Sequence, residues 1–166
     1  MMFKTHLAFS LLIALLITLF LNIPDKLMFI LVLTISSSFP DIDSDKSKIG
    51  RRFPIISKLI NLLFGHRGIF HSIFPPLIVL SISLYFNLFY IGLAIFIGYL
   101  THLIADSITI EGINFLYPFS DFRVKGLIRT GSLIESLTFF LLIGLNALMI
   151  YKFPLWLTPI RYTLWE

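Results

Sequence analysis

A histidine and an aspartate stand four residues apart near the end of a long apolar tract, in GYLTHLIADSIT (residues 98–109). At this spacing His102 and Asp106 lie on one face of a helix, one turn apart. An ionisable residue in a membrane helix costs about 2.5–3.5 kcal/mol on insertion scales, and such residues commonly serve a function. A divalent cation offsets this cost, because imidazole and carboxylate groups are ligands for zinc, manganese and iron. A hydrogen bond between the two side chains near the membrane surface is the alternative.

Two more histidines flank an arginine in GHRGIFHS (residues 65–72). On one continuous helix, His66 and His71 would point about 140° apart. We therefore expect His66 to lie in a loop between Gly65 and Gly68, and His71 to begin the next element. The guanidinium of Arg67 could bind an anionic substrate such as a phosphate, or it could anchor the chain to lipid headgroups.

Three aspartates alternate in PDIDSD (residues 40–45). A calcium-binding EF-hand loop also begins in this way, but it needs glycine at its sixth position and glutamate at its twelfth. Those positions are Lys46 and Arg52, which excludes an EF-hand. Asp41 is the first candidate metal ligand, and Asp43 is a second ligand or a general base. Asp45 is expected to be a solvated loop residue.

The first and last apolar runs each carry one further candidate. His6 begins the first run, where a histidine alone would be read as an interfacial anchor. Glu135 lies in the first turn of the last run, in RTGSLIE, where it could act as a metal ligand or as a general base. The helix dipole also favours a glutamate there, and Thr130 or Ser132 could cap the same helix. A capping role for Glu135 therefore competes with a chemical one.

The composition indicates an integral membrane protein. The 166 residues are 57% hydrophobic, with a mean hydropathy of +0.93, well above the values of soluble domains. The absence of cysteine excludes disulfides and thiolate metal sites, so any bound ion must use His, Asp or Glu. We interpret the small positive net charge of +4 as a feature of membrane topology, and no nucleic-acid partner is expected.

Hydropathy predicts an all-α, polytopic membrane bundle of about five membrane-associated helices, forming a single domain over residues 1–166. Apolar runs cover about 7–21, 27–39, 73–110 and 133–151; the third is long enough for two helices, with a turn near Asn87. The second run is short for a span of about 20 residues. Lys and Arg gather in a basic loop at 40–72 and in 111–132, and Lys4 lies at the N-terminus, which predicts that these three regions are cytoplasmic in an inner-membrane protein.

With five antiparallel spans, every candidate residue falls at the same, cytoplasmic end of its helix. The bundle would then bring together side chains that are far apart in the sequence. We expect one or two divalent ions at this end, zinc first, with manganese and iron as alternatives. The predicted ligands are His6, Asp41, His66, His71, His102, Asp106 and Glu135.

The segments PDID, HRGIFHS, GYLTHLIADSIT, LYPFS and TGSLIE, in this order, resemble the YdjM-like family of inner-membrane metal-dependent hydrolases, which is also labelled LexA-binding. The resemblance runs from His6 to Glu135 and implies a membrane-embedded helical hydrolase. The pattern is also similar to the zinc phospholipase C and single-strand nuclease fold. That likeness implies zinc ligands at His6, Asp41, His66 or His71, His102, Asp106 and Glu135. This chain lacks the extra histidines of the three-metal site in that fold, so one or two ions are expected.

Taken together, these patterns favour a metal-dependent hydrolase that acts at the cytoplasmic membrane surface on a phosphoester of a lipid or lipid-linked substrate. Arg67 would neutralise the anionic substrate, and Asp43 or Glu135 would act as general base. One alternative is an ion or metal transporter, although a transport site should lie nearer the middle of the membrane. Another is a scaffold that binds a cytoplasmic protein through the basic residues of 44–58.

Overall fold

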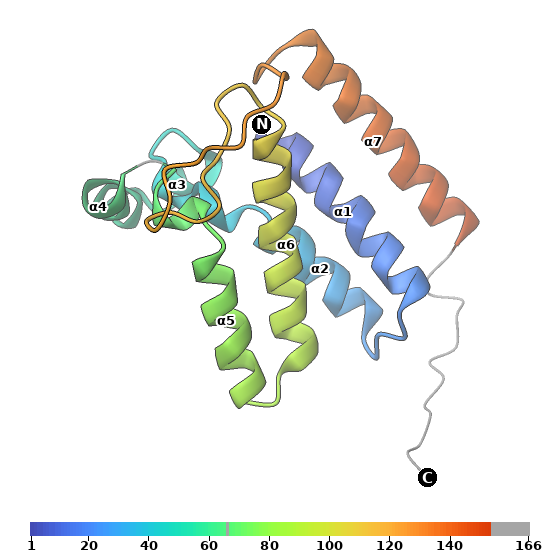
Figure 1. The fold of residues 1–166 in the computed structure, drawn as a ribbon. Coiled ribbons are helices and arrows are strands. Elements are labelled where there is room, and N and C mark those ends of the chain that lie inside the picture. The colour runs from blue at the N-terminus through green and yellow to red at the C-terminus, as the bar shows by residue number, and fades with distance from the viewer. Residues whose placement is uncertain (66, 154–166) are drawn as a thin grey trace.

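The chain folds into a bundle of α-helices that the computed structural model describes for residues 1–65 and 67–153 (Figure 1). No strand is assigned in these residues, and the predicted all-α class is confirmed. The long helices α1, α6 and α7 are apolar and long enough to cross a membrane. The α-helices are α1 (Phe3–Phe20), α2 (Lys26–Ser36), α3 (Lys48–Arg52), α4 (Pro54–Phe64), α5 (Phe74–Tyr85), α6 (Phe89–Ser107) and α7 (Leu133–Lys152), and the 3₁₀ helices are η1 (Phe39–Asp43) and η2 (Ile69–His71).

The five expected membrane-associated helices correspond to α1, α2, α5, α6 and α7. The tract 73–110 divides as predicted: Asn87 adopts a left-handed conformation (φ +57°) in the turn between α5 and α6. Asp25 caps α2 by accepting a hydrogen bond from the backbone N–H of Met28 at 2.9 Å. The second helix is short, as expected, with 11 residues, but α5 is short as well, with 12 residues.

The segment 40–72, expected to be a basic loop, contains η1, α3, α4 and η2. Local signals explain the two α-helices within it. The hydroxyl of Ser47 accepts a hydrogen bond from the backbone N–H of Gly50 and caps α3. Pro54 occupies the first turn of α4, where its missing N–H is not needed. This compact segment, rather than a free loop, fills the space at one end of the bundle.

A close backbone crossing sets the position of α6 against α2. A Cβ atom on Gly98 would lie 2.2 Å from the carbonyl oxygen of Leu33, so only glycine fits at the crossing. Leu33 itself is fully buried in a core cluster with Ala14, Phe29 and Ala94. Because Gly98 lies one turn before His102, this crossing brings the histidine against the end of α2.

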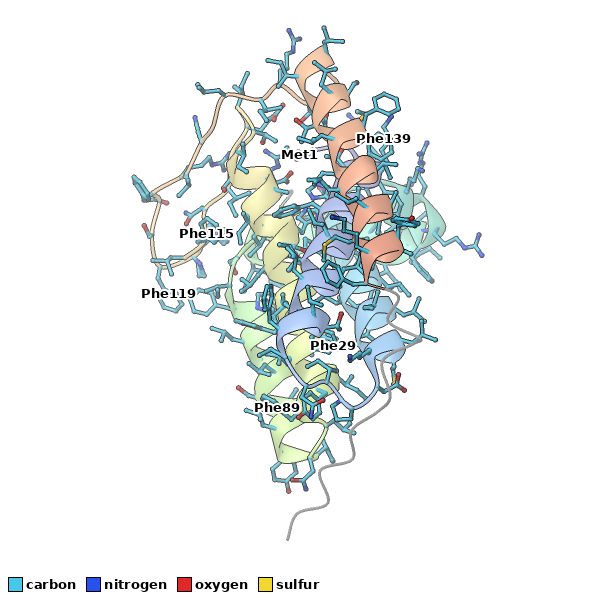
Figure 2. All side chains as sticks on the ribbon, turned by 90° about the vertical axis from the view of Figure 1, so that its right-hand side faces the viewer. Met1, Phe29, Phe89, Phe115, Phe119 and Phe139 are labelled. Carbon is cyan, nitrogen blue, oxygen red and sulfur yellow. The ribbon has the colours of Figure 1, made fainter. Side chains whose placement is uncertain are left out.

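The outer surface of the bundle is apolar. Large hydrophobic side chains are exposed along α5 and α7, such as Ile78, Phe140 and Leu141, and Figure 2 shows side chains pointing outward from these helices. Such a surface is unfavourable in water and suits contact with lipid. Met1 and Phe89 lie at opposite ends of the bundle (Figure 2). Helices α1, α5 and α7 begin, and α2 and α6 end, at the Met1 end (Figure 1).

Candidate metal centre

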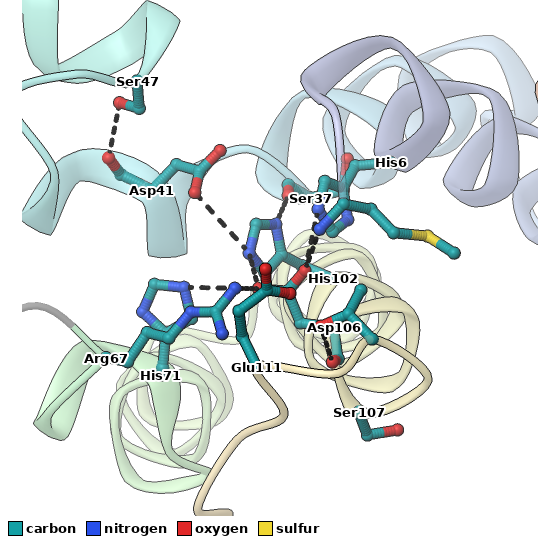
Figure 3. A network of polar contacts seen from close by, with 12 residues as sticks. His6, Ser37, Asp41, Ser47, Arg67, His71, His102, Asp106, Ser107 and Glu111 are labelled. Atoms are coloured by element: carbon teal, nitrogen blue, oxygen red, sulfur yellow. Dashed lines mark hydrogen bonds and ion pairs between the residues drawn. The ribbon is translucent and has the colours of Figure 1, made fainter. Parts of the chain in front are cut away.

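Five ionisable side chains from four segments meet at the Met1 end of the bundle (Figure 3). They form two overlapping groups, His6–His102–Asp106 and Asp41–His71–His102. Within each group, one ligand atom from each residue lies within 4.8 Å of the others. The groups share His102, so the five side chains surround one small volume at the end of α6.

Asp106 lies at the centre of this cluster. Its Oδ1 atom is 3.2 Å from Nε2 of His6, and its Oδ2 atom is 3.7 Å from Nε2 of His102 and 3.9 Å from Nε2 of His71. On the other side, Nε2 of His102 is 3.9 Å from Oδ1 of Asp41. Bond lengths of about 2.0–2.1 Å to a tetrahedral zinc place neighbouring ligand atoms about 3.3 Å apart. These separations suit a metal ion that takes the place of the amino-terminal ammonium group, which lies 2.5 Å from Oδ1 of Asp106.

The backbone fixes the tautomer of His102. Its Nδ1 atom lies 2.7 Å from the carbonyl oxygen of Ser37, and a carbonyl can only accept, so Nδ1 carries the proton. The Nε2 atom then presents a lone pair toward Asp106 and forms no hydrogen bond with the described residues, although the side chain is fully buried. A buried polar atom without a hydrogen bond is unfavourable, and a metal ion would satisfy it.

His6 stacks on His102. The two ring centroids are 3.9 Å apart with an interplanar angle of 8°. Neither ring nitrogen of His6 forms a hydrogen bond within the described part of the chain. Two stacked imidazolium ions would repel each other, so the stack disfavours two charged rings, and a neutral imidazole is the form that binds metals.

The Asp43 carboxylate binds the Nδ1 side of the His71 ring. Oδ2 of Asp43 is 2.9 Å from Nδ1 of His71, and it also accepts a hydrogen bond of 2.9 Å from the backbone N–H of Arg67. The Tyr99 hydroxyl donates to the carbonyl of Phe70 and ties η2 to α6. This carboxylate–histidine pairing is the arrangement that orients a metal-binding imidazole, with Nε2 directed at the metal.

Arg67 links the cluster to the segment after α6. Its backbone adopts a left-handed conformation (φ +61°), which is uncommon for a residue other than glycine. The guanidinium donates from Nη1 to the carbonyl of Gly112 at 3.1 Å and from Nη2 to Oδ2 of Asp106 at 3.2 Å. The guanidinium thus lies beside the ligand cluster and is bonded directly to one of the candidate ligands.

Glu135 lies outside both ligand groups. Its carboxylate is fully buried and accepts hydrogen bonds from the backbone N–H groups of Gly131 at 2.6 Å and Met2 at 2.5 Å. The Ser132 hydroxyl accepts a hydrogen bond from the backbone N–H of Glu135 at 3.3 Å and caps α7. These contacts match the capping alternative and join the start of α7 to the start of α1.

An open basin of about 800 Å³ lies over the cluster. Asp41 and Asp106 line it, and burial raises the pKa of the Asp41 carboxyl. A cation beside Asp41 would favour its ionised form. Six basic residues also line the basin: Lys4, Lys46, Lys48, Arg51, Arg67 and Arg123.

The sequence predicted most of the candidate ligands, but not the groups that hold them in place. Five predicted ligands meet, whereas Asp43 and Glu135 lie beside the groups, and His66 lies outside the described residues. The backbone supports, such as the Ser37 carbonyl, were not predicted, because a carbonyl contact depends on the fold rather than on residue type. Its only sequence signal is position, since Ser37 follows an apolar helix just before PDID.

Comparison with known proteins identifies the family to which this chain belongs. The family model of the YdjM inner membrane protein matches residues 1–165. The chain is 40% identical over 122 residues to YvsG of Bacillus subtilis (strain 168), which covers 72% of this chain and 74% of YvsG. It is 35% identical over 91 residues to the inner membrane protein YdjM of Escherichia coli (strain K12), which covers 48% of this chain and 43% of YdjM. No solved structure gives a significant match.

Proposed function

We propose that this chain, which belongs to the YdjM inner membrane protein family, is a metal-dependent hydrolase that cleaves phosphoesters at the cytoplasmic surface of the membrane. One observation supports this proposal above all. Three imidazoles and two carboxylates meet with ligand-atom separations suited to a metal ion, directly beneath a basin rich in lysine and arginine. A metal for chemistry and cations for an anionic substrate thus lie in one place.

His6, His71, His102, Asp41 and Asp106 would hold the metal. When bound, a divalent ion supplies an activated water and a positive charge for phosphoryl oxygens. Zinc suits these nitrogen and oxygen ligands best, with manganese and iron as alternatives. The two overlapping ligand groups could accommodate one ion at Nε2 of His102, and a second ion would have to be held by the other residues of these groups.

Arg67 and the basin would hold the substrate. The Arg67 guanidinium binds Asp106 on one side and lines the basin on the other, so a phosphate could bind beside the metal ligands. Among the described residues, Lys46, Arg51 and Arg123 form no ion pair. Their charge is thus available to a negatively charged headgroup or ester.

The contacts of Asp43 and Glu135 favour supporting roles over that of a general base. The carboxylate of Asp43 binds Nδ1 of His71, and that of Glu135 binds two backbone N–H groups. Carboxylate oxygens engaged by these donors have fewer lone pairs left to take a proton from water. We therefore assign His71 orientation to Asp43 and the junction of α1 with α7 to Glu135.

The proposal is tested by measuring metal content and hydrolysis in the same samples. The full chain, purified in detergent and reconstituted in lipid nanodiscs, would be analysed for bound metals and assayed on a chromogenic phosphodiester and on phospholipids by ³¹P NMR. His102→Ala and Asp106→Asn should lose metal and hydrolysis together, while Asp121→Asn, which changes an exposed aspartate, should keep both. Turnover by metal-free wild-type protein would refute the proposal.

Other outcomes of the same experiment would favour the alternatives. Stoichiometric metal without turnover on any phosphoester, together with ion flux into sealed vesicles, would identify a metal transporter. Capture of a cytoplasmic protein through residues 44–58, unaffected by His102→Ala, would identify a scaffold. Each result separates one function from the other two.

A further inference from the structure

Helix α4 presents its polar side to the protein and its apolar side outward. Ser57 is fully buried, and Nδ2 of Asn61, one turn later, donates to the carbonyl of Asp43 at 2.7 Å. On the opposite side, Ile55 and Leu62 are 83% and 82% exposed, and Leu59 between them is also exposed. These three residues recur at intervals of three and four and share one helix face. This outward apolar face is the reverse of the pattern of a helix that faces water.

Such a face needs an apolar partner. Burying one leucine or isoleucine side chain is worth about 1.5–3 kcal/mol relative to leaving it in water. Ile56 and Leu63 extend the exposed face of Ile55, Leu59 and Leu62 to five large aliphatic side chains. Over one short helix, this is a patch of the kind that marks a membrane or protein contact.

The orientation of α4 indicates which partner covers it. Figure 1 views α4 end-on, whereas α5 and α6 are seen from the side, so α4 runs across the direction of the membrane-crossing helices. It lies at the end of the bundle that carries the ligand cluster and packs on η1. When α1, α6 and α7 cross the membrane, α4 therefore lies parallel to the membrane plane.

The charges around α4 favour lipid over a second protein chain. Lys58 lies on α4 beside the apolar face, and Arg51 and Arg52 precede the helix. All three are exposed and attract the anionic headgroups of a membrane surface. In a contact between two copies, the same cations would bring like charges from both chains to one interface, which is unfavourable.

We propose that α4 is an in-plane interfacial helix, with Ile55, Leu59 and Leu62 in the acyl boundary of the same bilayer that the bundle crosses, and with Lys58 and the preceding arginines at anionic headgroups. Through the hydrogen bond from Asn61, the lipid-bound helix supports the backbone of Asp43. Lipid contact would thus set the depth of η1, and with it the mouth of the basin, at headgroup level.

The chain has no cysteine, so a single introduced cysteine gives one unique spin label. The full chain would carry the label at Ile55→Cys or Leu62→Cys in nanodiscs of phosphatidylcholine and phosphatidylglycerol. Accessibility to oxygen and to a water-soluble nickel complex would be measured by EPR. Phe140→Cys on α7 serves as the lipid reference, and Asp45→Cys, in the turn before α3, as the aqueous reference.

The ratio of oxygen accessibility to nickel accessibility should be at least several-fold higher for labels at positions 55 and 62 than for the label at position 45. It should also indicate a shallower depth in the bilayer than the label at position 140. Nickel access equal to that at position 45 would overturn the proposal. So would shielding from both reagents with dipolar broadening between labels, which would place a second copy on α4. Neither readout depends on metal or hydrolysis, so the proposed function can fail without affecting this result.

Discussion

The Nδ1 atom of His71 and the Oδ2 atom of Asp43 lie 2.9 Å apart, and both side chains are fully buried. The two residues are 28 positions apart in the sequence and come from different 3₁₀ helices, η1 and η2. This contact fixes the ring of His71 so that Nε2 points toward Asp106 at 3.9 Å. A carboxylate in such a position acts on a metal through the histidine that it orients.

Replacement of this carboxylate tests the assignment. Asp43→Asn should weaken metal binding about 10- to 100-fold, because the amide orients the imidazole less well and does not increase its basicity. The measurement is a competition titration with a metal chelator, and Asp45→Asn, at an exposed position of the same segment, is the matched control. If Asp43 were instead the general base, Asp43→Asn would abolish turnover with metal affinity unchanged.

The crossing at Gly98 should be intolerant of any side chain. Gly98→Ala places a methyl group 2.2 Å from the carbonyl of Leu33, so α2 and α6 must separate and His102 moves away from Ser37. We expect a loss of about 1–3 kcal/mol in stability and weaker metal binding, measured by thermal unfolding and by metal titration. Gly144→Ala on α7, where an added Cβ meets nothing within 4 Å, should leave metal binding unchanged and should not lower stability, because alanine is the better helix former.

Two neighbouring arginines allow a test of the basin. Arg51 lines the basin, whereas Arg52 does not. Arg51→Gln should raise the KM for an anionic ester roughly 3- to 10-fold with kcat little changed, because it removes attraction for the bound substrate, and the effect should shrink at high salt. Arg52→Gln should leave KM near the wild-type value. Equal effects from both changes would mean that general surface charge, rather than the basin, draws the substrate.

Glu135 should matter for stability more than for chemistry. Glu135→Ala leaves the backbone N–H groups of Gly131 and Met2 without their acceptor, which should cost about 1–3 kcal/mol in unfolding free energy. The metal content of the folded fraction should remain at the wild-type value. Loss of metal at unchanged thermal stability would make Glu135 a ligand and contradict the capping role.

The sequence predicted the bundle because its signals are local. Long apolar runs identify α1, α6 and α7, and Asn87 marks the turn between α5 and α6. The meeting of His6 with Asp106 could also be anticipated, because alternating spans bring the start of one helix beside the end of another. The length of α5 could not, since the apolar composition continues through the turn.

The supports of the site depend on tertiary structure. Whether Asp43 binds a metal, a water or His71 is decided by the fold of η1 against η2, and residue type is the same in each case. The same holds for the carbonyl of Ser37. By contrast, the sequence does indicate α4, because aliphatic residues at 55, 59 and 62 alternate with polar Ser57 and Asn61. The basic charges of 40–72 instead favoured the interpretation of this segment as a loop.

The shortness of α2 and α5 has a consequence for the lipid around the protein. At 1.5 Å per residue, these helices extend only about 17–18 Å, little more than half of the roughly 30 Å hydrocarbon core. A bilayer compensates for such hydrophobic mismatch by thinning locally, at a fraction of a kcal/mol per ångström. Local thinning is therefore expected beside α2 and beside α5, and the protein should partition toward thin or strongly curved regions of its membrane.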